Sequence, residues 1–311
     1  MPHPGISRSK IGSFACLLLI LCCIADRGVG RLDFLDWPGM TAAFLLVAGL
    51  PHGALDVELL TNWADDPAHI SVTSSVIAYI CLALSVTLLW WLLPTAALVG
   101  LLLMSAYHFG GDWPGLEHVG ERVVVGAALL SAPALAHQTS VTFIFSWLIP
   151  NEAVSAVAGV MNSLSLPLLL GAAGVVCFRW QKSRPQCEEI IVVAFAATIL
   201  PPLTFFVIYF CALHSMRHLA DARLTLSNVR SSALVFRGAP YAATAMACCL
   251  AGSVFFLGIP LGAAFLSSVF VGLAALTLPH MLLCELPISA SAKTKVAPHN
   301  GSRSGRLFKG M

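Results

Sequence analysis

Charged residues are scarce in this chain. Its 311 residues include 17 Lys or Arg and 15 Asp or Glu, and its formal net charge is +2. A soluble domain has about a quarter of its residues charged, whereas this chain has 10%. The basic residues are spread over loops and tails rather than gathered on one face, so we expect no nucleic acid partner. The composition excludes an ordinary water-soluble fold.

The motifs of several metalloenzyme classes are also missing. The chain has ten cysteines but no CxxC pair, which leaves little support for a thiolate metal site or a thioredoxin-like centre. It has no HExxH, the motif of zinc proteases, and one HxxxH where a di-iron desaturase would have several His-rich boxes. A haem protein that uses paired histidines stays open at this point.

Long apolar runs are abundant. Hydrophobic residues make up 58% of the chain, and runs of about twenty residues, enough to span a bilayer, follow one another. Strand-like alternation is absent, so helices must satisfy the backbone polar groups within the membrane. We predict an all-α, polytopic integral membrane bundle with about nine (eight to ten) transmembrane helices, in the cell membrane. The expected spans lie near residues 12–25, 39–60, 70–92, 95–113, 122–149, 152–178, 190–220, 239–257 and 260–285.

The chain divides into three predicted segments. Residues 1–38 hold a hydrophobic helix and a connecting loop, and residues 39–287 form the bundle that carries the chemistry. Residues 288–311 are polar, basic and rich in Gly and Ser, so this tail is expected to be disordered. Within the bundle, the pair Pro201-Pro202 is expected to divide the run 190–220 into two helices.

Four histidines lie inside or at the ends of apolar runs: His52, His108, His214 and His218. An ionisable side chain at membrane depth is costly and indicates a functional site. His214 and His218 are four residues apart, so on a helix they share a face and can bind one metal ion. The alternative is a pair of helix-end histidines at the water interface, because Arg217 and other charged residues are close by.

Aspartates accompany these histidines at helical spacing. Asp56 follows His52 by four residues, and Asp112 follows His108 by four. A histidine that binds a metal usually donates its second N–H to a carboxylate or carbonyl, so both aspartates are candidates for that role. Asp221, three residues after His218, is a third candidate. The alternative is a buried His–Asp hydrogen bond that only joins two helices.

Several residues near the histidines are candidates for a substrate pocket. Tyr107 and Phe109 flank His108, and Tyr209 and Phe210 precede His214. His280, which follows a proline in TLPHMLLCE, is a fifth candidate: it could be a metal ligand, but we expect it either to line the pocket or to make a structural hydrogen bond. The alternative for the aromatic residues is ordinary packing against lipid or neighbouring helices.

Four short blocks appear in a fixed order along the chain: PHGALD, YHFGGD, LHSMRH and PHMLLCE. Together they resemble the Brp/Blh family of β-carotene 15,15′-dioxygenases, and the resemblance covers most of residues 39–286. It implies a helical membrane enzyme with four histidine ligands to Fe(2+), which carry over onto His52, His108, His214 and His218. Neutral imidazoles suit a divalent iron and can leave coordination positions open for dioxygen.

The resemblance also implies the reaction: cleavage of the central 15,15′ double bond of all-trans-β-carotene by dioxygen, giving two all-trans-retinal. β-Carotene and dioxygen would be the substrates, and the carotenoid would enter from the lipid bilayer. A retinal-binding rhodopsin is a functional partner compatible with this product. The alternative from another class is a membrane transporter or proton pathway that uses intramembrane His and Asp.

Overall fold

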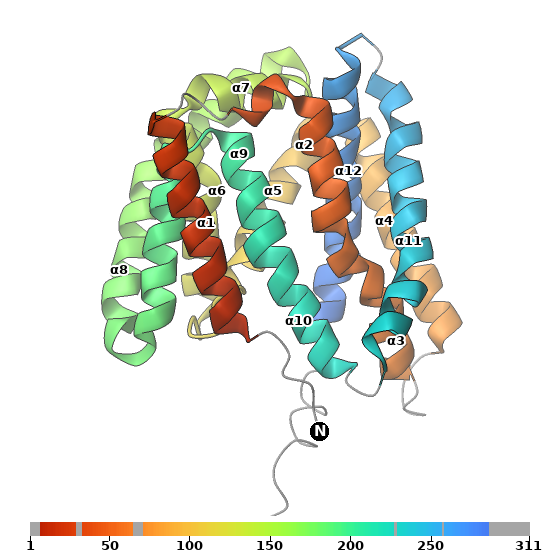
Figure 1. Ribbon diagram of the computed structural model, residues 1–311. Coiled ribbons are helices and arrows are strands. Elements are labelled where there is room, and N and C mark those ends of the chain that lie inside the picture. The colour runs from red at the N-terminus through yellow and green to blue at the C-terminus, as the bar shows by residue number, and fades with distance from the viewer. Residues whose placement is uncertain (1–6, 29–32, 65–70, 227–228, 257, 286–311) are drawn as a thin grey trace, which may run out of the picture.

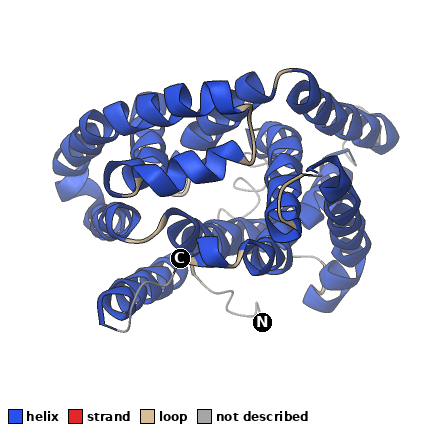
Figure 2. Ribbon diagram, turned by 90° about the horizontal axis from the view of Figure 1, so that it is seen from above, coloured by secondary structure: helices blue, strands red, loops and turns tan. Residues whose placement is uncertain are grey.

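The computed structural model describes residues 7–28, 33–64, 71–226, 229–256 and 258–285. These ranges contain helices, turns and loops but no strand, so the all-α prediction is confirmed (Figure 2). The polar tail predicted at 288–311 lies outside the described residues.

The longer helices run up and down side by side (Figure 1). The elements in chain order are α1 (Arg8–Gly28), α2 (Pro38–Phe44), the π-helix η2 (Leu45–Gly49), the 3-10 helix η3 (Leu50–Leu55), α3 (Asp56–Ala64), α4 (Val72–Leu92), α5 (Pro94–Gly110), α6 (Val119–Ala136), α7 (Gln138–Ser146), α8 (Asn151–Ile199), α9 (Pro202–Ile208), the π-helix η4 (Tyr209–His214), α10 (Ser215–Thr225), α11 (Ser231–Gly252) and α12 (Leu261–Glu285), with short 3-10 turns at Phe34–Asp36 and Ser253–Phe256.

Seven of the described helices are long and apolar enough to cross a membrane, or eight if the bent pair Pro38–Gly49 and Gly53–Thr61 forms one span. The predicted count of about nine is slightly too high. Helix α5 has 17 residues and falls below the length that defines a span. Helix α8 is counted once, although it contains all of one predicted span and part of another.

Helix α8 is bent back on itself. At 49 residues it would be about 74 Å long if straight, far more than a bilayer requires. The backbone at Ser183 is not helical (φ −141°, ψ 42°), and Pro185 follows. Beyond the break the Cys187 thiol lies 3.6 Å from the carbonyl oxygen of Val176, so the two arms run side by side as a hairpin (Figure 1).

Two prolines end this helix where the sequence predicts a division. Helix α8 stops at Ile199, and α9 begins at Pro202. A proline has no backbone N–H and is tolerated in the first turn of a helix, so Pro202 can start α9 without losing a hydrogen bond. The helix that carries the HxxxH pair therefore begins as a separate element, α9–η4–α10.

The N-terminal helix α1 is part of the bundle. Its residues Ile11, Ala15 and Leu19 recur at helical spacing and are buried. They place one face of α1 in the same apolar core as α8 and η4. The first predicted segment is therefore packed against the segment that carries the candidate site.

A close crossing of α5 and α6 fixes the position of His108. A Cβ atom on Gly126 would lie 1.9 Å from the carbonyl oxygen of Ala106, which no side chain could tolerate. Glycine at this position lets the two backbones touch, as small residues do at helix interfaces in membranes. The last turn of α5, which carries His108, is thereby held against α6.

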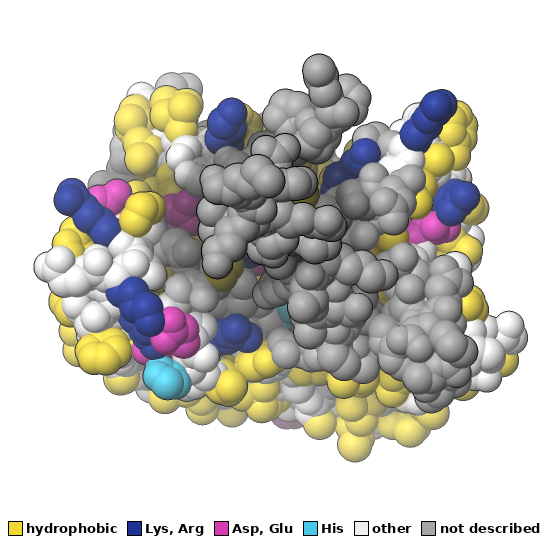
Figure 3. Space-filling model, turned by 90° about the horizontal axis from the view of Figure 1, so that it is seen from below, with side chains coloured by type: hydrophobic (Ala, Val, Ile, Leu, Met, Phe, Trp, Pro, Cys, Tyr) yellow, Lys and Arg dark blue, Asp and Glu magenta, His cyan; other side chains and the backbone are white. Residues whose placement is uncertain are grey.

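Charged side chains gather at one end of the bundle among hydrophobic ones (Figure 3). In the loop between α5 and α6, Glu117 is paired with Lys182 at 2.5 Å and with Arg179 at 3.1 Å. The hydrogen bonds from Lys182 and Arg179 hold the pKa of the Glu117 carboxyl below its ordinary value. Such a polar end is suited to the water and headgroup side of a membrane.

Candidate metal centre and apolar cavity

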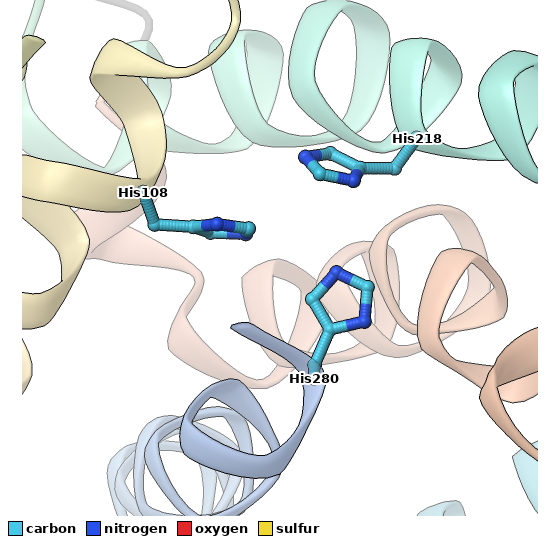
Figure 4. Close-up of side chains that lie close together, drawn as sticks. All are labelled: His108, His218 and His280. Atoms are coloured by element: carbon cyan, nitrogen blue, oxygen red, sulfur yellow. The ribbon is translucent and has the colours of Figure 1, made fainter. Parts of the chain in front are cut away.

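Four imidazole rings meet inside the bundle. His108 comes from the last turn of α5, His214 from the end of η4, His218 from α10 and His280 from α12. Figure 4 shows His108, His218 and His280 pointing toward one another from their three helices. Elements far apart in the sequence thus bring their histidines to one place.

The His108 ring lies close to the other three rings. The His108 ring centroid lies 4.8 Å from that of His214, 4.9 Å from that of His218 and 5.4 Å from that of His280. His214 and His218, the HxxxH pair, are 4.5 Å apart. One ligand atom each of His108, His218 and His280 lies within 4.8 Å of the other two. The second compact group is Asp112, His214 and His218.

Two π-helices shape this region. The segment η4 ends at His214, and η2 lies directly before η3, the turn that contains His52. A π-helix inserts an extra residue into a turn and often occurs at a functional site. The two pack closely, because a Cβ on Gly49 would come within 2.4 Å of the Phe210 ring. The Ser215 hydroxyl also donates to the Gly49 carbonyl at 3.2 Å.

One buried carboxylate orients His214. The Nδ1 atom of His214 lies 3.1 Å and 3.2 Å from the two carboxylate oxygens of Asp112, and the Tyr209 hydroxyl donates to the same carboxylate at 2.7 Å. A carboxylate next to Nδ1 favours a proton on that nitrogen, which leaves the Nε2 lone pair for a metal ion. The unit Tyr209–Asp112–His214 therefore fixes a ring and its tautomer.

A second unit repeats this arrangement at His280. Its Nδ1 lies 2.9 Å from one carboxylate oxygen of Asp56, and the Tyr79 hydroxyl donates to the other at 2.7 Å. The Nε2 atom of His280 is 3.5 Å from the Cys284 sulfur, one turn along α12. Asp56 and Asp112 are each only 1% exposed.

These partners differ from the i+4 pairs that the sequence suggests. Asp112 accepts from His214 rather than from His108, because α5 ends at Gly110 and the chain turns before Asp112. Asp56 accepts from His280. The predicted pair of Asp56 with His52 lies outside what is described, since the structure describes the backbone of His52 but not its side chain.

The third candidate aspartate has another role. Asp221 forms an ion pair with Arg8 of α1 rather than with a histidine. Arg8 and Arg217 each donate to the backbone carbonyl of Asp112, at 3.0 Å and 2.9 Å. Arg217 also pairs with Glu189 at 2.6 Å. The arginine between the two histidines thus holds the loop that carries Asp112.

An apolar cavity extends from the histidines through the bundle. His108, His214 and His280 line one end of it. The other lining residues are almost all hydrophobic: Gly53, Tyr79, Leu98, Leu101, Leu102, Ser105, Phe109, Leu129, Leu130, Pro133, Val141, Ile144, Phe145, Leu148, Met161, Pro202, Leu203, Phe205, Phe206, Tyr209, Phe210, Phe270, Leu273, Leu276 and Thr277. A long apolar ligand is the class of molecule that such a lining fits.

Several predicted pocket residues are in this lining: Phe109, Tyr209, Phe210 and His280. Tyr107 is not. For His280, a role in the pocket or in a structural hydrogen bond is the expectation from the sequence, and a role as a metal ligand is the less favoured alternative. The signal that supports a ligand is its Pro-His pair, which repeats the Pro51-His52 pair of PHGALD.

The donor set fits a transition metal. Imidazole nitrogens suit iron, zinc, copper and nickel, and the rings of His108, His218 and His280 point toward one another (Figure 4). A buried His cluster able to hold a metal ion therefore borders the cavity.

Comparisons with known proteins agree with this geometry. Residues 43–286 match the family described as beta-carotene 15,15'-dioxygenase. The curated beta-carotene 15,15'-dioxygenase of uncultured marine bacterium 66A03 is 30% identical over 284 residues, which cover 85% of this chain and 99% of that protein. No solved structure matches this chain significantly. The family match spans every described element from η2 to α12, and this chain belongs to the beta-carotene 15,15'-dioxygenase family.

Proposed function

We propose that this protein cleaves the central 15,15′ double bond of all-trans-β-carotene with dioxygen and releases two molecules of all-trans-retinal. One carbon–carbon double bond is broken, and each new carbonyl receives one oxygen atom of dioxygen. The observation that carries the proposal is the position of a histidine cluster at one end of a long apolar cavity. Family membership favours this enzyme over a transporter or proton pathway.

We further propose that Fe(2+) is the metal and that His52, His108, His214 and His218 are its ligands. The clustering of three of these rings supports the assignment. His52 is assigned from the sequence, with support from its neighbour Gly53, which lines the cavity beside the other histidines. Bound iron would supply the activation of dioxygen, for which imidazole ligands leave open positions.

The protein's own contribution is orientation and exclusion of water. Asp112 holds the His214 ring and its tautomer, and Asp56 does the same for His280. The aromatic residues Phe109, Tyr209 and Phe210 border the cavity next to the histidines. They would place the polyene against the metal and keep water from the reacting bond.

The same proposal indicates where the substrate comes from and where the product goes. A hydrocarbon substrate dissolves in the bilayer, so it would enter between helices rather than from water, and the apolar helices are consistent with a multi-pass protein of the cell membrane. The retinal product would be available to a retinal-binding rhodopsin. We expect no nucleic acid partner.

The test is expression in a host that makes β-carotene, followed by chromatography of its retinoids and metal analysis of the purified protein. We expect retinal together with bound iron, and neither in the His218→Ala variant. A folded, iron-loaded protein that makes no retinal would contradict the reaction. A fully active protein without iron would contradict the cofactor.

A further inference from the structure

The cavity has a defined length. It is lined along α5 from Leu98 to His108 and along α12 from Phe270 to His280. Each stretch covers ten steps along a helix, from its first to its last lining residue, which is about 15 Å. His108 and His280 both lie at the same end of the cavity, so α5 and α12 independently give the same cavity length. A space of this length can receive about one half of an extended carotenoid.

Helix α7 lies at the far end of this space. In Figure 1 it runs across the upper end of the bundle, whereas most helices run up and down. Val141, Ile144 and Phe145 of α7, with Leu148 just after it, line the cavity. All four are buried or nearly so, with Phe145 7% exposed. The opposite side of α7 faces outward, and Phe143 there is 51% exposed.

We infer that α7 is the end wall of the substrate site and that its distance from the histidines selects the double bond that is cut. This inference rests on the proposed carotenoid cleavage. The end ring of one substrate half would contact Phe145 and its neighbours, which places the central double bond at the histidines. The other half then lies on the opposite side of the cluster.

The physical basis is that a symmetric polyene offers no polar group to mark its centre. All of its conjugated double bonds are apolar and similar, so recognition of one of them must come from shape. A rigid wall at a fixed depth provides such a measure, because the substrate slides inward until its ring is stopped. Packed helix side chains can form this wall, since protein interiors are densely filled.

The test removes one ring from either side of α7. Phe145→Ala deepens the cavity, and Phe143→Ala removes the same side chain from the outward side as a matched control. With β-carotene as substrate, we expect Phe145→Ala to raise the ratio of unequal carbonyl products to retinal by about tenfold or more, the scale of discrimination by small changes in an apolar pocket. Phe143→Ala should give retinal alone.

Two further variants keep the inference open to refutation. Phe145→Leu removes less volume and replaces Phe145→Ala if that protein does not fold, as judged by size-exclusion chromatography. Ile144→Phe shortens the cavity and should lower β-carotene turnover more than turnover of an apocarotenal that lacks one end ring. If wild type makes retinal and all cavity variants also make only retinal, with unchanged substrate preference, the end wall is refuted. If wild type makes no retinal, the proposed function itself fails.

Discussion

Two units of the same three residue types each hold one ring of the histidine cluster. Tyr209–Asp112–His214 and Tyr79–Asp56–His280 each have a tyrosine hydroxyl 2.7 Å from a carboxylate that in turn faces a histidine Nδ1. Neither unit comes from one stretch of chain. The repetition indicates that the fold orients at least two rings of the cluster by one physical device.

The two units differ in what surrounds the carboxylate. Asp112 lies in a loop whose backbone carbonyl accepts from Arg217 and Arg8. Asp56 begins helix α3, where the positive end of the helix dipole favours its charge. Among the described residues, no arginine donates to Asp56. The Asp112 unit is thus held by charged side chains from other helices, and the Asp56 unit by local helix geometry.

The largest expected effect comes from removing the rings themselves. His214→Ala should abolish turnover and lose bound iron, because it deletes a proposed ligand and leaves Asp112 without its partner. If an orienting carboxylate marks a metal ligand, His280→Ala should lose iron as well. Metal analysis of both purified variants checks this. Full iron content in His280→Ala would show that the two units are not equivalent and that His280 is a residue of the cavity wall rather than a ligand.

The next effect concerns Arg217, which donates to the backbone carbonyl of Asp112 and so holds the loop that carries it. Arg217 is 3% exposed and pairs with Glu189, and removal of one partner of a buried ion pair costs about 3–5 kcal/mol. Arg217→Met should therefore lower the melting temperature in detergent strongly. The matched control is Arg237→Met, whose pair with Glu58 is half-exposed and is worth about 0–1 kcal/mol. Equal melting temperatures for the two variants would contradict a stabilising role of Arg217.

A smaller effect is expected from neutralising either carboxylate. Asp112→Asn and Asp56→Asn keep an oxygen that can accept from Nδ1 but lose the charge that raises the basicity of the ring. Changes in the partner of a metal-binding histidine typically cost about 10- to 100-fold in metal affinity, so Asp112→Asn should show this loss and Asp56→Asn should show it only if His280 also binds iron. Iron titration of the apoprotein measures this. Asp221→Asn is the control, since Asp221 pairs with Arg8 and not with a histidine.

The iron losses of Asp112→Asn and Asp56→Asn also decide whether Asp112 binds the metal itself. If Asp112 were itself a ligand with His214 and His218, as in the second group, Asp112→Asn should lose far more iron than Asp56→Asn. Similar losses in both variants would support a role in orientation for each. The bonds that Asp112 already shares with His214 and Tyr209 favour the second outcome.

Much of the helical class and part of the cluster were predictable from the sequence, and the reasons are specific. The HxxxH spacing places His214 beside His218 wherever that segment is helical. The partners of Asp112 were not predictable, because the i+4 rule assumes an unbroken helix and α5 ends at Gly110. The meeting of Asp56 with His280 joins residues 224 positions apart, which only the tertiary fold decides.

The smallest expected effect separates the tyrosines. Tyr209→Phe and Tyr79→Phe each remove one hydroxyl that donates to a carboxylate, a bond worth about 0.5–1.5 kcal/mol. Tyr209 is 1% exposed, so water cannot replace its hydroxyl, whereas Tyr79 is only partly buried. We therefore expect Tyr209→Phe to weaken iron binding more than Tyr79→Phe. Iron titration of the two variants decides, and a larger loss in Tyr79→Phe would show that burial of the tyrosine does not determine how much its hydroxyl contributes to iron binding.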